Sequence, residues 1–305
     1  MALLRSADSS DVADHGSPPV LRSRNHEKRE KREDAKRVVL IAGLKGGEGK
    51  STFARVLIEL IRRFLGGGLA VAAADGDLDV GQTSSFLAER DGQGSPFGEQ
   101  NVFSGVVGFD FLGEDDARTY ATLVAHDAER VVIDLPAGSM KRVIAPTAMI
   151  DADRFIDQME SLGKRVTIIH ILSPMLASLN GLDDAVRAFG DRVDHIAVRN
   201  LARGKPDDFV IWAGGNAWPD WTNPGRNVRT RFEAAGGTEI DFPALPAGTY
   251  ALIDAFQISF ADALERFRND WVHRANLQGW LIKVAHQIDR VRPQLGLPLD
   301  AEWKL

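Results

Sequence analysis

Short runs of apolar residues alternate along this chain with longer amphipathic stretches. The apolar runs are RVVLIAG (37–43), LAVAAAD (69–75), RVVID (130–134), VTIIHIL (166–172) and HIAVRN (195–200). The amphipathic stretches are KSTFARVLIELIRRFL (50–65), DADRFIDQMESLG (151–163) and SLNGLDDAVRAFG (178–190). The runs predict strands covered on both faces, and apolar residues at helical spacing predict helices. Their alternation predicts the fold class α/β, a doubly wound, mostly parallel sheet flanked by helices.

Other segments give less regular patterns. Residues 103–113 suit either an antiparallel hairpin or an edge strand, and residues 203–236 predict an irregular insertion containing three tryptophans. Two C-terminal helices are expected over 251–270 and 271–291. The second has an apolar stripe, formed by Leu277, Trp280, Leu281, Val284 and Ile288. Such a stripe suits a membrane surface or the core of a domain, and we expect packing against the domain.

Residues 1–36 are polar and end in a run of charges, which predicts a disordered charged tail before a single domain over 37–305. No apolar run reaches the roughly 20 residues that a membrane-spanning helix needs. The apolar start of the chain is too short for a secretory signal, so we expect a cytoplasmic protein.

The chain contains no cysteine and has a formal net charge of −6. The first fact excludes disulfides, thiolate metal sites, iron–sulfur clusters and cysteine nucleophiles. The second argues against a dedicated nucleic-acid-binding protein, although a local basic patch is compatible with it.

The stretch GLKGGEGKST (43–52) lies between a predicted strand and a predicted helix. Glycines there leave backbone N–H groups able to surround phosphate oxygens, and the start of the helix favours anions. The general pattern G-x-x-x-x-G-K-[ST] has a glycine where this chain has Leu44, so a glycine-rich surface turn is the alternative. The predicted nucleotide-binding residues here are Gly46, Gly47, Glu48, Gly49, Lys50, Ser51 and Thr52.

The seven residues KGGEGKS resemble the deviant Walker A motif, KGGxGK[ST], of the ParA/MinD superfamily of ATPases. Members of that family need no glycine before the first lysine. The resemblance implies ATP and Mg²⁺ as cofactors, with Lys50 on the β- and γ-phosphates and Ser51 as a Mg²⁺ ligand. It also implies that Lys45 contacts the phosphates of a partner subunit in an ATP-bound homodimer. An exposed loop lysine is the simpler interpretation of Lys45.

Acidic residues follow two other predicted strands, in DGDLDVGQTSS and RVVIDLPAG. The resemblance implies that Asp77 orients the attacking water and that Asp75 and Asp134 serve the metal. Asp79 offers a competing register for Asp77, and a solvated acidic loop or a strand-capping aspartate are the alternatives without a ligand. Pro136 and Gly138 resemble a switch II turn that senses the γ-phosphate.

Evidence for the base-binding end is limited to two segments. Asn200 ends a predicted strand where the family places an asparagine on the adenine, although it is equally suited to a turn. Residues Leu245, Pro246 and Ala247 resemble the segment that flanks the base, with Pro243 as a second register. The sequence has no [NT]-K-x-D guanine signature, which favours ATP over GTP.

The resemblance covers roughly residues 37–265 and implies an ATP-dependent dimerisation switch with slow ATPase activity. The expected role is positioning or segregating DNA or other cargo, with a partner protein that accelerates hydrolysis. The alternative is a MinD-like scaffold that docks on a membrane or on a conjugation or secretion apparatus; a metabolic ligase or kinase is a third. Non-specific DNA would require a basic face, for which the candidates are Arg226, Arg229, Arg231, Arg266, Arg268, Arg274 and Lys283. A solvated helix face explains the same residues.

Overall fold

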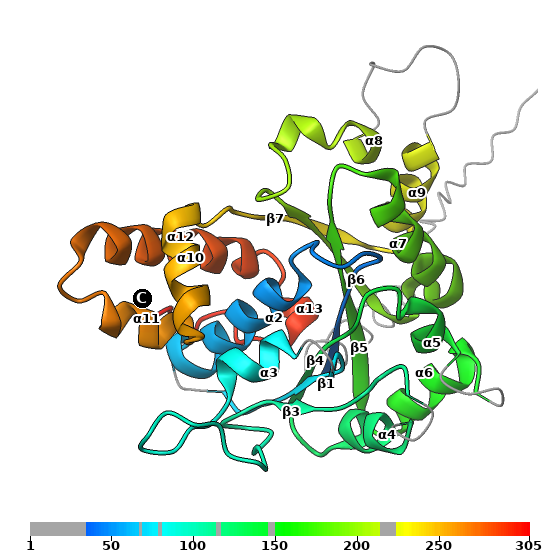
Figure 1. Cartoon of the computed structure of the whole chain (residues 1–305). Coiled ribbons are helices and arrows are strands. Elements are labelled where there is room, and N and C mark those ends of the chain that lie inside the picture. Colours follow the sequence, from blue (N-terminus) through cyan, green and yellow to red (C-terminus); the bar gives the residue numbers. More distant parts are fainter. Residues whose placement is uncertain (1–34, 67–68, 79–80, 114–116, 146–149, 214–223) are drawn as a thin grey trace, which may run out of the picture. The chain divides into compact units, whose positions relative to one another are not determined.

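A computed structural model describes residues 35–66, 69–78, 81–113, 117–145, 150–213 and 224–305. Within it, seven strands form one parallel sheet in the order β3-β2-β4-β1-β5-β6-β7 (Figure 1). The strands are β1 Lys36–Ala42, β2 Val71–Asp75, β3 Val107–Gly108, β4 Arg130–Asp134, β5 Lys164–Leu172, β6 Asp194–Asn200 and β7 Thr238–Phe242. The predicted α/β fold class is therefore confirmed.

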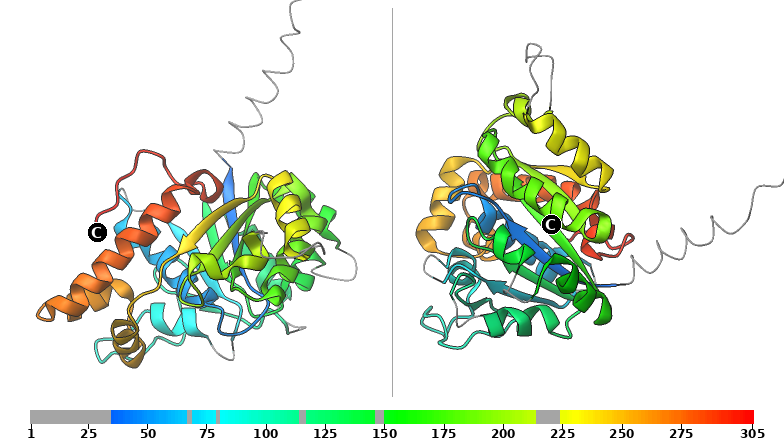
Figure 2. Two further views of the ribbon diagram at one scale, coloured as in Figure 1. Left: turned by 90° about the horizontal axis from the view of Figure 1, so that it is seen from above. Right: turned by 90° about the vertical axis from the view of Figure 1, so that its right-hand side faces the viewer.

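Helices cover both faces of the sheet, as the two views in Figure 2 show. On one face lie α2 Lys50–Glu59 with the π-helical turn Leu60–Phe64, α3 Gln82–Leu87, α10 Ala247–Phe256, α11 Phe260–Arg266, α12 Trp271–Asp289 and α13 Arg292–Leu295. On the other lie α4 Ala117–Ala125, α5 Met140–Ile144, α6 Ala152–Ser161, α7 Leu176–Phe189, α8 Val210–Ala213 and α9 Pro224–Ala234. Two 3₁₀ turns, Gly190–Arg192 and Pro206–Asp208, complete the regular structure.

Alternation of side chains along β1 explains this layering. Val39 and Ile41 face the core beneath α2 and α12, whereas Val38 and Leu40 face the core beneath α4 and α6. A strand with apolar residues on both faces requires cover on both, which is why it reads as one continuous apolar run. Strand β1 also lies at the centre of the sheet, between β4 and β5.

The predicted C-terminal stripe packs in the core. All five of its residues are at most 3% exposed, and the Trp280 indole N–H donates to Pro243 O at 2.8 Å. The first predicted helix, 251–270, is instead two helices, because Gln257 takes a left-handed φ of 47° between α10 and α11. No helix in the described part of the chain is both long and apolar enough to cross a bilayer.

Two other predictions need revision. Part of the stretch predicted to be irregular is helical: α8 and α9 contact each other, and Trp212 is 2% exposed beside Phe232. The i, i+4 pair Val228 and Phe232 supplies the buried face of α9. Within the segment 103–113, the two residues Val107–Gly108 form the edge strand β3, parallel to β2, so the hairpin alternative is wrong. The predicted tail up to residue 34 and residues 214–223 lie outside the described residues.

Candidate functional site

The loop 43–49 leaves β1 and enters α2 at the carboxyl edge of the sheet. Asp75 on β2 and Asp134 on β4 lie at the level of Ile41 on β1. Asp134 pairs in register with both Asp75 and Ile41. The carboxyl ends of parallel strands are where α/β proteins place their ligands. The topology therefore brings together the two segments, loop and acidic strand ends, that the sequence singled out separately.

Gly49 is required by its position at the start of α2. Its φ of 97° lies in the region that favours glycine. A Cβ at this position would stand 2.3 Å from Asn200 Nδ2, so any larger residue would displace the Asn200 side chain. The glycine thus lets strand β6 approach the underside of the loop.

Three side-chain contacts hold the loop in shape. Lys50 Nζ donates to Lys45 O at 3.3 Å, so the ammonium lies under the loop and the side chain is only 8% exposed. Glu48 is buried as well: Oε2 accepts from Lys45 N at 3.2 Å, and Oε1 accepts from the Ser173 hydroxyl at 3.3 Å. Since this carboxylate supports the loop from within, any contribution of Glu48 to a bound anion comes from its main-chain N–H.

Lys45, in contrast, is exposed, as are Gly46 and Gly47. Its backbone N–H and carbonyl contact Glu48 and Lys50, while the residue as a whole is exposed to solvent. The two lysines of the loop therefore occupy different environments, one under the loop and one on its exposed side.

Asp134, at the end of β4, is 2% exposed and has one unpaired oxygen. Its Oδ2 accepts from the Thr83 hydroxyl at 2.7 Å, whereas Oδ1 has no hydrogen-bond partner within the described residues. Burial, followed by the charge of Asp75, raises the pKa of Asp134 to about 7; the hydroxyls of Thr83 and Ser51 and the Lys50 ammonium oppose this rise. A buried carboxylate with an unpaired oxygen is costly unless a cation or a donor meets it.

Asp75 fixes the segment that follows β2. Its Oδ1 accepts from Asp77 N at 3.1 Å, and its Oδ2 accepts from Ser84 N at 2.9 Å. Burial raises the pKa of Asp75, and these two N–H donors lower it. Each oxygen keeps a second lone pair, so Asp75 stays a predicted metal ligand. Asp77 is half-buried on this segment, and its rival Asp79 lies outside the described residues.

The turn after β4 is bonded directly to the loop. Gly138 N donates to Gly43 O at 3.1 Å, and Gly138 has a φ of 73°. The predicted switch II segment therefore contacts the first residue of the phosphate-loop candidate. Because of this hydrogen bond, movement of one segment would displace the other.

Asn200 braces the loop in this structure. Its Nδ2 donates to Glu48 O at 2.6 Å, its Oδ1 accepts from Ala202 N at 3.0 Å, and the residue is 3% exposed. Both ends of the amide are therefore occupied by the protein's own backbone. The predicted contact with adenine stays a prediction.

Pro246 is exposed at the start of α10. One turn further along, the Tyr250 hydroxyl lies 3.2 Å from Thr52 Oγ1. This contact places the start of α10 beside the start of α2, so Pro246 belongs to a segment that reaches the predicted nucleotide site.

Sequence reasoning missed four of the described residues at this site. Thr83 bonds Asp134, Tyr250 bonds Thr52, Ser173 donates to Glu48 Oε1, and an Arg203 guanidinium N–H donates to Gly47 O on the loop. Thr83 was within the acidic segment already singled out, where a hydroxyl near two carboxylates was a usable signal. Arg203 and Tyr250 had none, because their contacts join residues more than 150 positions apart.

Neither a protein-family model nor a curated protein matches this chain. Among solved structures, it is similar to a nucleotide-binding protein from Archaeoglobus fulgidus in complex with ADP. The identity is 16%, the match covers 76% of this chain and 91% of that chain, and the TM-score is 0.36. A similarity at this level carries no conclusion about ligand or activity, which rest on this chain's own residues.

Proposed function

We propose that this protein is a slow ATPase of the ParA/MinD type, in which ATP binding drives dimerisation. One observation supports this most directly: the loop KGGEGKS lies at the same sheet edge as Asp75, Asp77 and Asp134. A glycine-rich surface turn would require neither the buried lysine nor the buried carboxylates beside it.

The loop offers two sources of attraction for phosphate. Backbone N–H groups of Gly46, Gly47 and Gly49 lead into the positive end of α2. The Lys50 ammonium donates to a neutral carbonyl, Lys45 O, at 3.3 Å. A phosphate oxygen is the better acceptor, because a hydrogen bond between two charged groups is roughly twice as strong as one to a neutral group.

The acidic strand ends fit a divalent cation. The orphaned Oδ1 of Asp134 is the kind of hard oxygen that Mg²⁺ takes, and the Ser51 hydroxyl and Asp75 lie near it. Bound Mg²⁺ would neutralise charge on the nucleotide phosphates. Ser51, Asp75 and Asp134 would hold the ion, and Thr83 would keep the Asp134 carboxylate oriented through its hydrogen bond.

Asp77 and Lys45 would complete the chemistry. Asp77 sits on the segment that Asp75 holds in place, where a half-buried carboxylate can orient the attacking water. Lys45 is exposed to solvent on the loop. A lysine that contacts the phosphates of a second subunit has to be exposed in this way. A cation supplied by the partner makes dimerisation depend on the γ-phosphate.

Substitution of Lys50 by Ala tests nucleotide binding. We expect Lys50→Ala to weaken binding of a fluorescent ATP analogue by at least about tenfold, since a charge-assisted hydrogen bond contributes roughly 1.5–3 kcal/mol. Lys283→Ala, which removes an exposed lysine from α12, is the matched control. Unchanged affinity in Lys50→Ala would contradict the loop assignment.

Dimerisation is tested separately, on an Asp77→Ala background that is expected to slow hydrolysis and trap the ATP state. Sedimentation velocity with ATP and with ADP should show an ATP-specific dimer, and adding Lys45→Ala should abolish it while nucleotide still binds. A persisting dimer would refute the role of Lys45 in trans. A dimer trapped by Asp79→Ala instead would move the switch I register by two residues.

The cargo is proposed to be DNA or a protein complex. The apolar stripe of α12 is buried, so docking on a membrane through this helix would require removing it from the core. Of the basic candidates for DNA, Arg229 pairs with Glu233 and Arg231 with Asp183, which reduces their positive field.

Binding of Asp77→Ala to non-specific duplex DNA across a salt series distinguishes the cargoes. ATP-dependent binding that weakens steeply with salt indicates DNA, and no binding in either nucleotide state would direct the search to a protein or membrane dock.

A further inference from the structure

The turn that follows β6 contacts the phosphate-loop candidate through two side chains. Asn200 Nδ2 donates to Glu48 O at 2.6 Å, and an Arg203 guanidinium N–H donates to Gly47 O. The turn is closed by its own backbone, since Arg203 N donates to Asn200 O at 2.9 Å. Two consecutive carbonyls of the loop are therefore held by one turn of the chain.

Holding a carbonyl also orients the N–H group of the same peptide unit. In a trans peptide the C=O and the N–H point in opposite directions, and the described part of the chain has no cis peptide bond. The Glu48 N–H therefore points away from the Arg203 guanidinium, and the Gly49 N–H points away from Asn200. Because both donors belong to one turn, both N–H groups are directed away from that turn.

The N–H groups of the loop have no acceptor in the protein itself. Within the described residues, the main-chain N–H groups of Gly46, Gly47, Glu48 and Gly49 donate no hydrogen bond. Gly47 and Gly49 have left-handed φ values of 76° and 97°. Successive N–H groups around left-handed residues form a concavity that binds anions. The loop thus offers a set of unused donors whose direction depends on the carbonyls behind them.

The Arg203 guanidinium is well suited to hold such a carbonyl. The residue is exposed to solvent, and among the described residues no carboxylate forms an ion pair with it. A charged donor binds a carbonyl more strongly than a neutral one does. It also polarises the peptide unit, which makes the N–H at the other end of that unit a better donor.

We propose that Arg203 is a positioning residue for phosphate, which holds Gly47 O so that the Glu48 N–H faces the phosphates of the nucleotide. This inference rests on the proposed function, in which the loop binds ATP. Backbone N–H groups of a phosphate loop surround the α- and β-phosphates, which ADP and ATP share. Arg203 should therefore support the binding of both nucleotides equally, unlike a cation that contacts the γ-phosphate.

The test measures the affinity of fluorescent ADP and ATP analogues for the full chain and for Arg203→Ala, Arg203→Lys and Arg290→Ala. Arg290 is the matched control, because it is also exposed and its Nη1 donates to a neutral oxygen, Gln287 Oε1, at 3.2 Å. Arg203→Ala should weaken both nucleotides about fivefold, the loss expected for one hydrogen bond. Arg203→Lys keeps a charged donor and should lose less than about twofold, whereas Arg290→Ala should bind as the unmodified protein does.

Two further measurements distinguish positioning from other roles of an exposed arginine. The long-range attraction of such a charge is screened at about 0.5 M NaCl, whereas a loss that comes from loop geometry should persist there. The free energy of unfolding in urea should be the same for Arg203→Ala and Arg290→Ala, which shows that the lower affinity does not come from a less stable fold.

The proposal is overturned if Arg203→Ala binds both nucleotides as tightly as Arg290→Ala, if it loses affinity for ATP alone, or if its loss disappears at high salt. Each of these results leaves the proposed function standing when Lys50→Ala still loses nucleotide. If the unmodified protein binds neither nucleotide, the proposed function fails and the role of Arg203 fails with it.

Discussion

Replacing Gly49 by alanine should destabilise this protein more than an alanine at another left-handed glycine. The matched control is Gly163, which follows α6 with a φ of 67° and has no atom within 4 Å of the position of its Cβ. Both substitutions strain the backbone by about 1–2 kcal/mol and restrict the unfolded chain alike. Only Gly49→Ala introduces a contact, 2.3 Å from Asn200 Nδ2.

The additional cost follows from the hydrogen bond that this contact breaks. Asn200 must turn away from the new methyl group, so Nδ2 no longer donates to Glu48 O. Loss of that bond inside the protein costs about 1–3 kcal/mol. We therefore expect Gly49→Ala to lower the free energy of unfolding by about 3 kcal/mol, and Gly163→Ala by about 1 kcal/mol.

Equilibrium unfolding in urea, followed by the fluorescence of the six tryptophans, measures these differences. Asn200→Ala removes the same hydrogen bond without backbone strain. The double variant Gly49→Ala/Asn200→Ala should thus be about as stable as Gly49→Ala alone, a coupling of about 1 kcal/mol or more. The reasoning is refuted if Gly49→Ala costs no more than Gly163→Ala, or if the two substitutions are additive.

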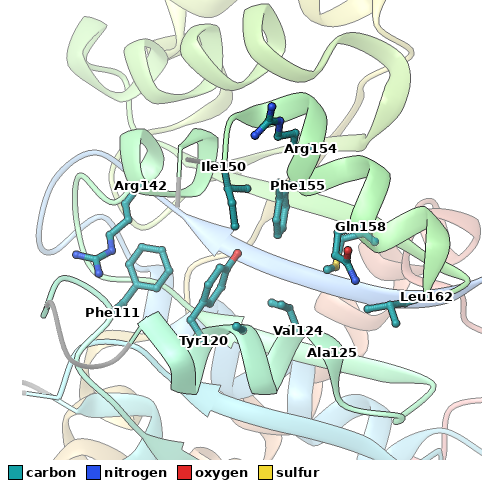
Figure 3. Close-up of a pocket in the computed structure, with 12 residues that line it drawn as sticks. Phe111, Tyr120, Val124, Ala125, Arg142, Ile150, Arg154, Phe155, Gln158 and Leu162 are labelled. Carbon is teal, nitrogen blue, oxygen red and sulfur yellow. The ribbon is translucent and has the colours of Figure 1, made fainter. Parts of the chain in front are cut away.

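Three further outcomes are expected from the fold. Burial lowers the pKa of His195 to about 4, so below about pH 6.5 the unfolded chain binds a proton that this ring does not bind in the native state. The raised pKa of Asp134 acts with the opposite sign over the same range, so the His195 contribution is measured as the difference in the free energy of unfolding between the unmodified protein and His195→Gln. That difference should fall by up to about 3 kcal/mol between pH 6.5 and pH 4, and a constant difference would contradict this. Leu281→Ala should cost about 2–5 kcal/mol in the core, whereas its exposed neighbour Ile282→Ala should cost under about 0.5 kcal/mol; equal losses would place α12 outside the core. Tyr120→Phe should raise the melting temperature, because it removes a buried hydroxyl that has no partner within the described residues (Figure 3), and a lowered value would show that the hydroxyl already has a partner.

Strands that are buried on both faces appear in the sequence as continuous apolar runs, and these strands could be predicted. Strands β1, β2, β4, β5 and β6 were all found this way, with ends within about two residues. Strand β7 was missed because it lies at the edge of the sheet, where only Ile240 and Phe242 are buried. Its polar residues serve long-range ion pairs, such as Asp241 with Arg199, that no local pattern reveals.

The site was predictable as far as its chemistry is local in sequence. Glycines and lysines of the loop are consecutive, and Asp75 and Asp134 each end an apolar run. What joins them is not local: Thr83 meets Asp134 across 51 residues, and Asn200 meets Glu48 across 152. Such contacts depend on the order of strands in the sheet, which the spacing of motifs leaves undetermined.

The central position of β1 has a consequence during synthesis. This strand is made before the other described strands, yet its two neighbours, β4 and β5, begin at Arg130 and Lys164. About 120 residues separate the end of β1 from the start of β5, which is roughly 6–24 s at 5–20 residues per second. Throughout that interval the apolar run VVLIA has no strand of its own chain to pair with on that side, and pairing with another chain is the competing outcome. Yield on expression should therefore depend on how well a holdase chaperone shields the first strand while the rest of the sheet is being made.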